Sequence, residues 1–181
     1  MLALEWSAVD LGPLVSDIMD RVRDQMRGRS VRMLMPERLP QVQADPMRVE
    51  QILINLLSNA AKYSTSGTEI SVEAKVLPTE VELAVTNEGS GLTEDETGKV
   101  FTRFYRSKNQ VGKVEGLGIG LYIAKGLVEA QGGHIWVDSE PGRFTTFHFT
   151  LLRTDASPEL VNAGANPGSP RIAELTTEGA G

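Results

Sequence analysis

The chain has no cysteine among its 181 residues, which excludes a disulfide framework and any metal site built on thiolates. It also lacks an apolar run near the roughly 18–20 residues that a helix needs to span a bilayer. Basic residues are in the minority, because 18 lysines and arginines face 24 aspartates and glutamates, for a net charge of −6. That balance argues against a broad nucleic-acid-binding surface, which would be basic, but a local basic cluster can still serve the phosphates of a nucleotide.

Hydrophobic periodicity divides the chain into helices and strands. The expected helices are 10–28, 45–64 and 121–130. The expected strands are 31–35, 69–76, 80–86, 134–138 and 145–152, with a brief pairing at 41–43 and no element in residues 1–7 alone. We therefore predict an α+β fold, a two-layer α/β sandwich whose mixed, mostly antiparallel sheet is covered on one face by about three helices. Residues 1–153 form this domain, and residues 154–181, rich in Ala, Gly, Pro, Ser and Thr, are expected to be a disordered tail.

The helix expected at 45–64 has two distinct faces. Asp45 is its expected N-cap and Pro46 its first helical residue. The apolar stripe that it turns to the core consists of Val49, Ile52, Leu53, Leu56, Leu57 and Ala60. The opposite face carries Asn55, Asn59, Lys62 and Tyr63. An amide oxygen can ligate Mg²⁺ and an ammonium can meet a phosphate, whereas a solvated polar face explains this helix equally well when it is taken alone.

Two glycine-bearing segments follow. Asn87-Glu88-Gly89-Ser90-Gly91 ends a strand and would let a flat ring approach the backbone while the Asn87 oxygen accepts its amino proton, although a plain turn has the same composition. Glu115–Leu121 contains Gly116, Gly118 and Gly120 directly before a helix, where free amide N–H groups suit a polyphosphate. A flexible linker is the alternative. No Walker A loop is present, and the glycine spacing is a poor match to a Rossmann fingerprint.

Two further segments complete the pattern. Val100–Lys108 mixes aromatic residues with Arg103, Arg106 and Lys108, which suits a lid that docks its phenylalanines and presents cations to a phosphate; a basic surface loop is the alternative. Gly142–Phe147 enters the last strand and offers hydroxyl groups to the floor of a base pocket.

In this order and spacing, the segments resemble the catalytic and ATP-binding domain of bacterial sensor histidine kinases, of the superfamily shared with gyrase, heat-shock chaperone and mismatch-repair ATPases. The resemblance covers roughly residues 8–152. The motifs that carry it are DPMRVEQILINLLSNAAKYS (N box), NEGSGL (first glycine box), FTRFYRS (phenylalanine box), EGLGIGLYIAKGLVEAQGGHIWV (second glycine box) and GRFTTF (third glycine box). It implies a Bergerat ATP-binding fold with a lid loop.

The resemblance also implies roles for individual residues. Asn59 matches the magnesium-binding asparagine, and Asn55 stands where hydrolytic relatives carry a general-base glutamate. Because an amide cannot take a proton from water, the site is poorly built for hydrolysis. Catalysis is expected from Asn55, Asn59, Lys62 and Arg106. The implied nucleotide site consists of Asn55, Asn59, Lys62, Tyr63, Asn87, Gly89, Gly91, Leu92, Phe104, Arg106, Lys108, Gly116, Leu117, Gly118, Ile119, Gly120, Leu121 and either or both of Thr145 and Thr146.

Two positions depart from the family pattern. Asn87 stands where aspartate is usual, which keeps one acceptor oxygen but loses a charge worth about 1–2 kcal/mol in a hydrogen bond. Phe144 replaces the second glycine of the third box, which puts the geometry of that turn in doubt.

The expected function is transfer of the γ-phosphoryl group of Mg²⁺–ATP to a histidine on a separate dimerisation domain, with a response regulator as indirect partner. His134 and His148, the only histidines, lie in expected strands without the acidic neighbour of a phosphoacceptor and are interpreted as structural. The chain is therefore expected to be a cytoplasmic fragment of a longer kinase whose missing part can include a membrane anchor. It is expected to be monomeric when isolated and not bound to nucleic acid. The alternatives are an anti-sigma-type serine kinase, which usually lacks the phenylalanine box, and a degenerate docking module without catalysis.

Overall fold

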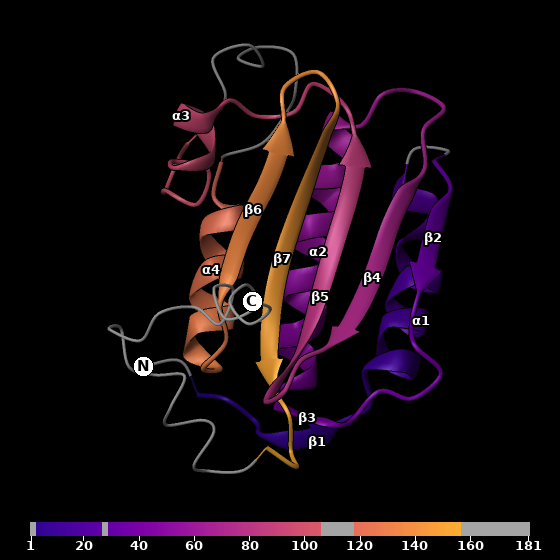
Figure 1. The fold of residues 1–181 in the computed structure, drawn as a ribbon, viewed down its shortest axis with the longest axis vertical. Coiled ribbons are helices and arrows are strands. Elements are labelled where there is room, and N and C mark those ends of the chain that lie inside the picture. Colours follow the sequence, from indigo (N-terminus) through magenta and orange to yellow (C-terminus); the bar gives the residue numbers. More distant parts are fainter. Residues whose placement is uncertain (1–2, 27–28, 106–117, 157–181) are drawn as a thin grey trace, which may run out of the picture.

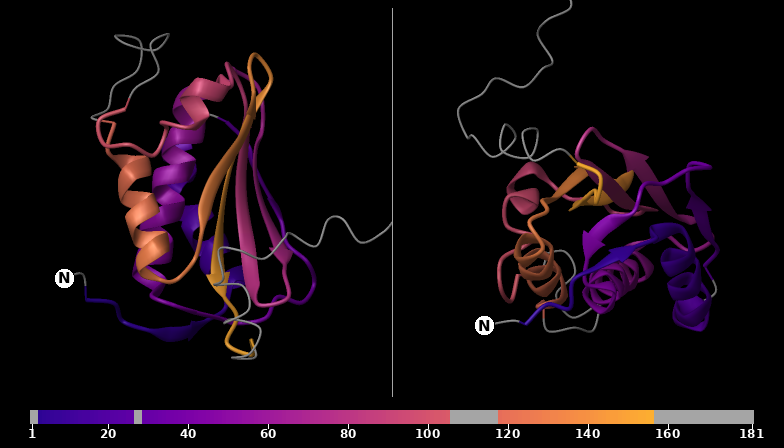
Figure 2. Two further views of the ribbon diagram at one scale, coloured as in Figure 1. Left: turned by 60° about the vertical axis from the view of Figure 1, so that its left-hand side comes forward. Right: turned by 90° about the horizontal axis from the view of Figure 1, so that it is seen from below.

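The computed structural model describes residues 3–26, 29–105 and 118–156, which fold into a five-stranded main sheet with helices on a single face and a separate two-stranded sheet (Figures 1 and 2). The elements are β1 (Ser7–Val9), α1 (Leu11–Val22), the 3-10 turn η1 (Arg23–Met26), β2 (Val31–Leu34), β3 (Val42–Ala44), α2 (Pro46–Tyr63), β4 (Ile70–Val76), β5 (Glu80–Glu88), α3 (Glu94–Thr97), α4 (Gly120–Ala130), β6 (Ile135–Glu140) and β7 (Phe144–Leu152).

The main sheet has the strand order β2-β4-β5-β7-β6. Only β2 and β4 run parallel, and the other neighbours are antiparallel. Helices α1, α2 and α4 lie on one side of this sheet, and no helix of the described residues covers its other face, which we call the open face (Figure 2). The expected two-layer sandwich with a mixed, mostly antiparallel sheet is confirmed.

The core lies between the helices and the inward face of the sheet. All six residues of the apolar stripe expected on α2 are buried, as are Leu11, Val15, Ile18 and Val22 of α1. From the sheet, alternate residues of β5 and β7 point inward, including Val85 and Phe147. Period-2 and period-3.6 patterns in the sequence thus predicted the two surfaces that pack together.

Several boundaries differ from those expected. Residues 7–9 form β1, which pairs with β3 in a separate two-stranded sheet, because a partner distant in sequence supplies the hydrogen bonds that a short segment cannot make alone. The first helix ends at Val22 and continues as the 3-10 turn η1, with residue 28 outside the described residues. The short helix α3 interrupts the segment expected to be irregular, and a capping box of Thr93 and Glu96 caps its N-terminus.

Strand limits also differ from those expected, because pairing with a neighbouring strand decides where each strand ends. β5 and β7 extend to Glu88 and Phe144, which pair with each other, while β6 runs from Ile135 to Glu140, so His134 precedes the strand rather than lying in it. At the other end of the domain, Thr154, expected to open the disordered tail, donates its backbone N–H to Gln41 O at 2.9 Å. Residues 157–181 of that tail lie outside the described residues.

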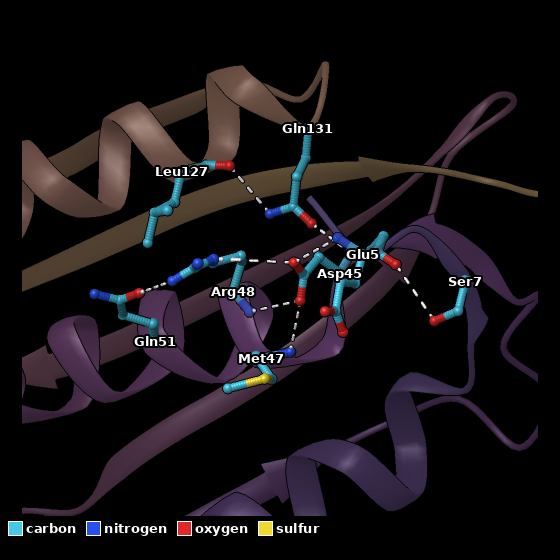
Figure 3. A network of polar contacts seen from close by, with 9 residues as sticks. Glu5, Ser7, Asp45, Met47, Arg48, Gln51, Leu127 and Gln131 are labelled. Carbon is cyan, nitrogen blue, oxygen red and sulfur yellow. Dashed lines mark hydrogen bonds and ion pairs between the residues drawn. The ribbon is translucent and has the colours of Figure 1, made fainter. Parts of the chain in front are cut away.

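The N-terminus of α2 is held by a network that joins three elements (Figure 3). Asp45 is the N-cap, as expected, and its Oδ1 accepts from the backbone N–H of Met47 at 3.0 Å. Its Oδ2 accepts from the backbone N–H of Glu5 at 3.0 Å. Gln131, at the end of α4, accepts from the Asp45 backbone N–H at 2.8 Å and donates to Leu127 O at 3.0 Å. This network fixes how α2 and α4 sit beside each other.

None of the helices in the described part of the chain is long and apolar enough to cross a membrane.

Candidate nucleotide site

The candidate site lies at the end of the domain opposite this network, where α2 and β5 end and α4 and β7 begin (Figure 1). Helix α2 presents Asn55, Asn59, Lys62 and Tyr63 on one side, each partly exposed, while its opposite side is buried in the core. The sequence therefore predicted correctly which side of α2 stays out of the core.

Asn55 lies against the N-terminus of α4. A Cβ placed on Gly120, the first residue of α4, would lie 3.4 Å from Asn55 Oδ1, so the helix start and the amide are in close contact. The Nδ2 atom of Asn55 is buried and has no hydrogen-bond partner among the described residues. An unpaired buried donor costs about 1–3 kcal/mol, a cost that a ligand oxygen would relieve.

The first backbone N–H groups of α4 are also hydrogen-bond donors that face the candidate site. Its N-cap residue, Ile119, has no side-chain oxygen and makes no capping hydrogen bond, so this cap leaves the first amide N–H groups of the helix without a side-chain acceptor among the described residues. Such a helix start favours an anion, because the amide donors and the helix dipole both point toward it. Asn55 Nδ2 and the α4 N-terminus together fit the phosphate groups of a nucleotide.

Asn87 and Thr145 form the inner floor of the site. They are register partners on β5 and β7, and both are buried, with exposed fractions of 3% and 7%. Thr146 faces the open side of the sheet, where its Oγ1 lies 2.9 Å from Thr86 Oγ1. Of the two threonines expected to back the base, the fold therefore brings only Thr145 beside Asn87.

Two glycines are required where the chain segments converge. A Cβ on Gly89 would lie 2.2 Å from Tyr63 O, where the end of α2 meets the end of β5. Gly91 has a φ of +61°, and a Cβ there would lie 2.1 Å from Glu140 O. No side chain fits at either position, so these glycines bring α2, β5 and the β6–β7 turn together at the edge of the site.

The turn before β7 forms although Phe144 stands where the family pattern has a glycine. Gly142, with a φ of +76°, takes the left-handed conformation, and Phe144 is an ordinary strand residue paired with Glu88 and Glu140. The doubt about this turn is thus removed, because position 144 needs no positive φ.

The beginning of the expected lid is described as far as Tyr105. Phe101 packs edge-on against Phe147, with ring centroids 5.9 Å apart. Phe104 is 61% exposed and has a φ of +64°, and the Arg103 guanidinium lies 4.7 Å from its ring centroid. The expectation that the phenylalanines dock is thus right for Phe101 and wrong for Phe104, whose exposed ring lies against the Arg103 guanidinium.

The backbone N–H of Phe104 donates to Gly118 O at 3.0 Å, which ties the lid segment to the second glycine segment. Gly118, Ile119, Gly120 and Leu121 all lie at the start of α4, as expected. The remaining expected site residues, Arg106, Lys108, Gly116 and Leu117, lie outside the described residues.

Sequence reasoning missed Ser139. Its Oγ accepts from the backbone N–H of Leu92, an expected site residue, at 2.8 Å and lies 3.0 Å from Thr145 Oγ1. The strand was expected to end at Asp138. Had it been continued, the alternation of Ile135 and Val137, which pack against the core, would have placed Ser139 on the inward face.

The two histidines lie away from these residues. His148 is on the open face of the sheet, stacked on Trp136 at 4.9 Å, with its Nδ1 2.8 Å from Glu82 Oε1 and its Nε2 3.2 Å from Asp138 Oδ2. His134 is exposed before β6 and donates its backbone N–H to Thr150 Oγ1.

Comparison with known proteins agrees with this geometry. Residues 44–155 match the family of histidine kinase-, DNA gyrase B- and HSP90-like ATPases. The chain is 37% identical over 145 residues to the adaptive-response sensory kinase SasA of Nostoc sp., covering 78% of this chain and 36% of the relative. It is 42% identical over 120 residues to the sensor histidine kinase WalK of Bacillus subtilis, covering 65% of this chain and 20% of that relative.

Among solved structures, full-length ShkA in complex with AMPPNP superposes with a TM-score of 0.74 at 27% identity, over 87% of this chain and 33% of that one. The chain therefore spans about a third of the length of these longer proteins or less. On family match, sequence identity and fold together, it belongs to the family of histidine kinase-, DNA gyrase B- and HSP90-like ATPases.

Proposed function

We propose that the domain binds Mg²⁺–ATP between α2, the start of α4 and the lid, and transfers the γ-phosphoryl group to a histidine of a separate dimerisation domain. The observation that carries this proposal is the buried Asn55 Nδ2, which has no partner in the described part of the chain, beside the N-terminus of α4, whose cap residue makes no side-chain hydrogen bond. Both features are donors, and both suit phosphate oxygens.

Asn59 is the residue we propose as the Mg²⁺ ligand. It lies one turn after Asn55 on the same side of α2 and is partly exposed. Its amide oxygen suits a hard cation, and the bound ion would neutralise charge on the phosphates. Lys62, on the same side of the helix, would add a positive charge near the phosphates.

The group transfer needs no base from α2. A histidine nitrogen forms a bond to the γ-phosphorus while the bond from this phosphorus to the β–γ bridging oxygen breaks. ADP leaves with the electron pair of that bond, and the phosphorylated imidazole releases its proton to water. Asn55 has no basic atom with which to activate water, so hydrolysis is expected to be slow. Catalysis then rests on positioning and on charge stabilisation.

The partners follow from this reaction. The phosphoacceptor is the histidine-bearing dimerisation domain of the parent kinase, and a response regulator receives the phosphoryl group afterwards. We place these reactions in the cytoplasm, where ATP is supplied, and expect the isolated domain to be monomeric. The serine kinase alternative is not favoured, because the named relatives are sensory and histidine kinases.

The test combines binding and transfer. Calorimetric titration with Mg²⁺–ADP should show binding, which Asn59→Ala should weaken in the presence of Mg²⁺ far more than in EDTA. Mixing the chain with Mg²⁺–ATP and a dimerisation domain from a related kinase should give an acid-labile phosphoprotein, as expected for phosphohistidine. An acid-stable product would favour the serine kinase, and absence of nucleotide binding would favour the docking module.

A further inference from the structure

Four residues from adjacent strands form one row across the inward face of the sheet. The register pairs Ile70 with Asn87, Asn87 with Thr145, and Thr145 with Ser139. The next inward row is apolar and contains Val85, Phe147 and Val137. The polar part of the first row therefore marks the boundary between the core and the nucleotide site.

Ser139 Oγ has three partners within hydrogen-bond distance. They are Phe144 O at 2.6 Å, the backbone N of Leu92 at 2.8 Å and Thr145 Oγ1 at 3.0 Å. A hydroxyl has one proton to donate and two lone pairs to accept with, so these three contacts use all of its capacity.

The direction of each bond follows from its partners. Phe144 O is a carbonyl oxygen that can only accept, so it takes the single proton of Ser139. The backbone N–H of Leu92 can only donate, so it takes one lone pair. The remaining lone pair of Ser139 must accept from Thr145, which means that Thr145 donates its own proton to Ser139.

We propose that Ser139 is a positioning residue that makes the buried hydroxyl of Thr145 an acceptor toward the site, and thereby favours a nucleobase that offers an amino group. With its proton committed to Ser139, Thr145 has only lone pairs left for a ligand. Its register partner Asn87 contributes the amide oxygen expected to accept from the same base. Two acceptors side by side suit the 6-amino group of adenine and oppose the 6-oxo group of hypoxanthine or guanine.

This inference deepens the proposed function and rests on it. The probes are Mg²⁺–ATP and Mg²⁺–ITP, titrated calorimetrically into the whole chain. Their bases differ at position 6, which carries an amino group in adenine and an oxo group in hypoxanthine, and at N1, which carries a hydrogen only in hypoxanthine. The wild-type domain should prefer ATP. Ser139→Ala should narrow the ATP-to-ITP affinity ratio by about three- to tenfold, the value of one hydrogen bond, because the freed Thr145 hydroxyl can rotate and donate to a 6-oxo group.

Two variants serve as controls. Ser139→Thr keeps a hydroxyl at this strand position and should leave the ATP-to-ITP affinity ratio at its wild-type value. Thr86→Val removes a hydroxyl from the Thr86–Thr146 pair on the open face and should leave the ratio unchanged. A structural defect alone would weaken both nucleotides together and would not change their ratio.

If Ser139→Ala fails to fold, Thr145→Val gives the decision. If Thr145 is an acceptor, as proposed, this substitution should weaken ATP binding and leave ITP binding as tight or tighter. If Thr145 is instead a donor, the substitution would weaken ITP binding most, and that result would overturn the proposal. An unchanged ratio in folded Ser139→Ala would overturn it as well. If the wild-type chain binds neither nucleotide, nucleotide binding itself is rejected and the role of Ser139 with it.

Discussion

The side-chain oxygen of Gln131 accepts the backbone N–H of Asp45 at 2.8 Å, although the two residues are 86 positions apart. Gln131 ends α4 and Asp45 caps α2, so this one bond joins the ends of the two helices that lie farthest from the candidate site (Figure 3). Farther from this bond, α2 contributes Asn55 from its middle and α4 begins with Gly120, and these two residues lie in close contact. The network therefore holds the two helices that carry the phosphate-facing groups.

Gln131→Leu should destabilise the domain by about 1–3 kcal/mol, because the buried N–H of Asp45 would lose its acceptor in a fully buried position. Chemical denaturation measures the change. Lys125→Ala, which removes only an exposed ion pair with Glu129 on the same helix, should stay within about 0.5 kcal/mol of wild type. Equal stability of the two variants would contradict the importance of the Gln131–Asp45 bond.

Gly89→Ala should destabilise the fold by about 1–3 kcal/mol or more, since its Cβ would lie 2.2 Å from the Tyr63 carbonyl oxygen. Gly126→Ala is the matched control: position 126 is an exposed helical site with nothing within 4 Å of the added Cβ. There the same substitution should stabilise by about 0.5–1 kcal/mol through helix propensity. Thermal denaturation of both variants should give shifts of opposite sign, and shifts of the same sign would refute the steric argument.

Asn55→Leu should raise stability without nucleotide by about 1 kcal/mol and lower Mg²⁺–ATP affinity about tenfold. The substitution removes a buried donor that has no partner among the described residues, which relieves its desolvation cost. The same change deletes a group that would bind a phosphate. Denaturation and calorimetry on one sample measure both quantities, with Ser58→Ala on the same helix as the control. Unchanged affinity would remove Asn55 from the site.

The two phenylalanines of the lid segment should respond differently to substitution. Phe101→Ala should cost about 2 kcal/mol, because it removes an edge-on contact with the buried Phe147. Phe104→Ala should change stability by less than about 0.5 kcal/mol, since that ring is 61% exposed. Urea titrations that gave equal losses would show that Phe104 packs against the domain in solution.

Stability at alkaline pH should depend on Tyr105. Burial, followed by the nearby Glu96 and Asp95 carboxylates, raises the pKa of Tyr105 from its usual 10.0. The folded state then holds the phenolic proton more tightly than the unfolded state. The protonated Tyr105 therefore contributes to the free energy of unfolding below about pH 10, and this contribution is lost as pH rises through the folded-state pKa. Tyr105→Phe should remove the corresponding decline from a plot of unfolding free energy against pH. Parallel curves for the two proteins would exclude this role.

The sequence by itself determined the local features of this protein. The apolar stripe of α2, its Asp45 cap, the alternation along β4, β5 and β7, and the polar side with Asn55 and Asn59 all follow from periodicity and capping, which depend on residues a few positions apart. The periodicity also predicted the two-layer fold, and the order of the family motifs named the residues of the candidate site, which stay predictions.

Tertiary structure decided the relations between segments distant in sequence. The pairing of β1 with β3, the contact of Gly89 with Tyr63, the choice of Thr145 over Thr146 and the three bonds of Ser139 were settled only when the strands took their register. The physical reason is that one hydroxyl or one glycine has no preferred partner along the chain. Its role depends on which backbone or side chain the packed sheet and helices bring within a few ångströms.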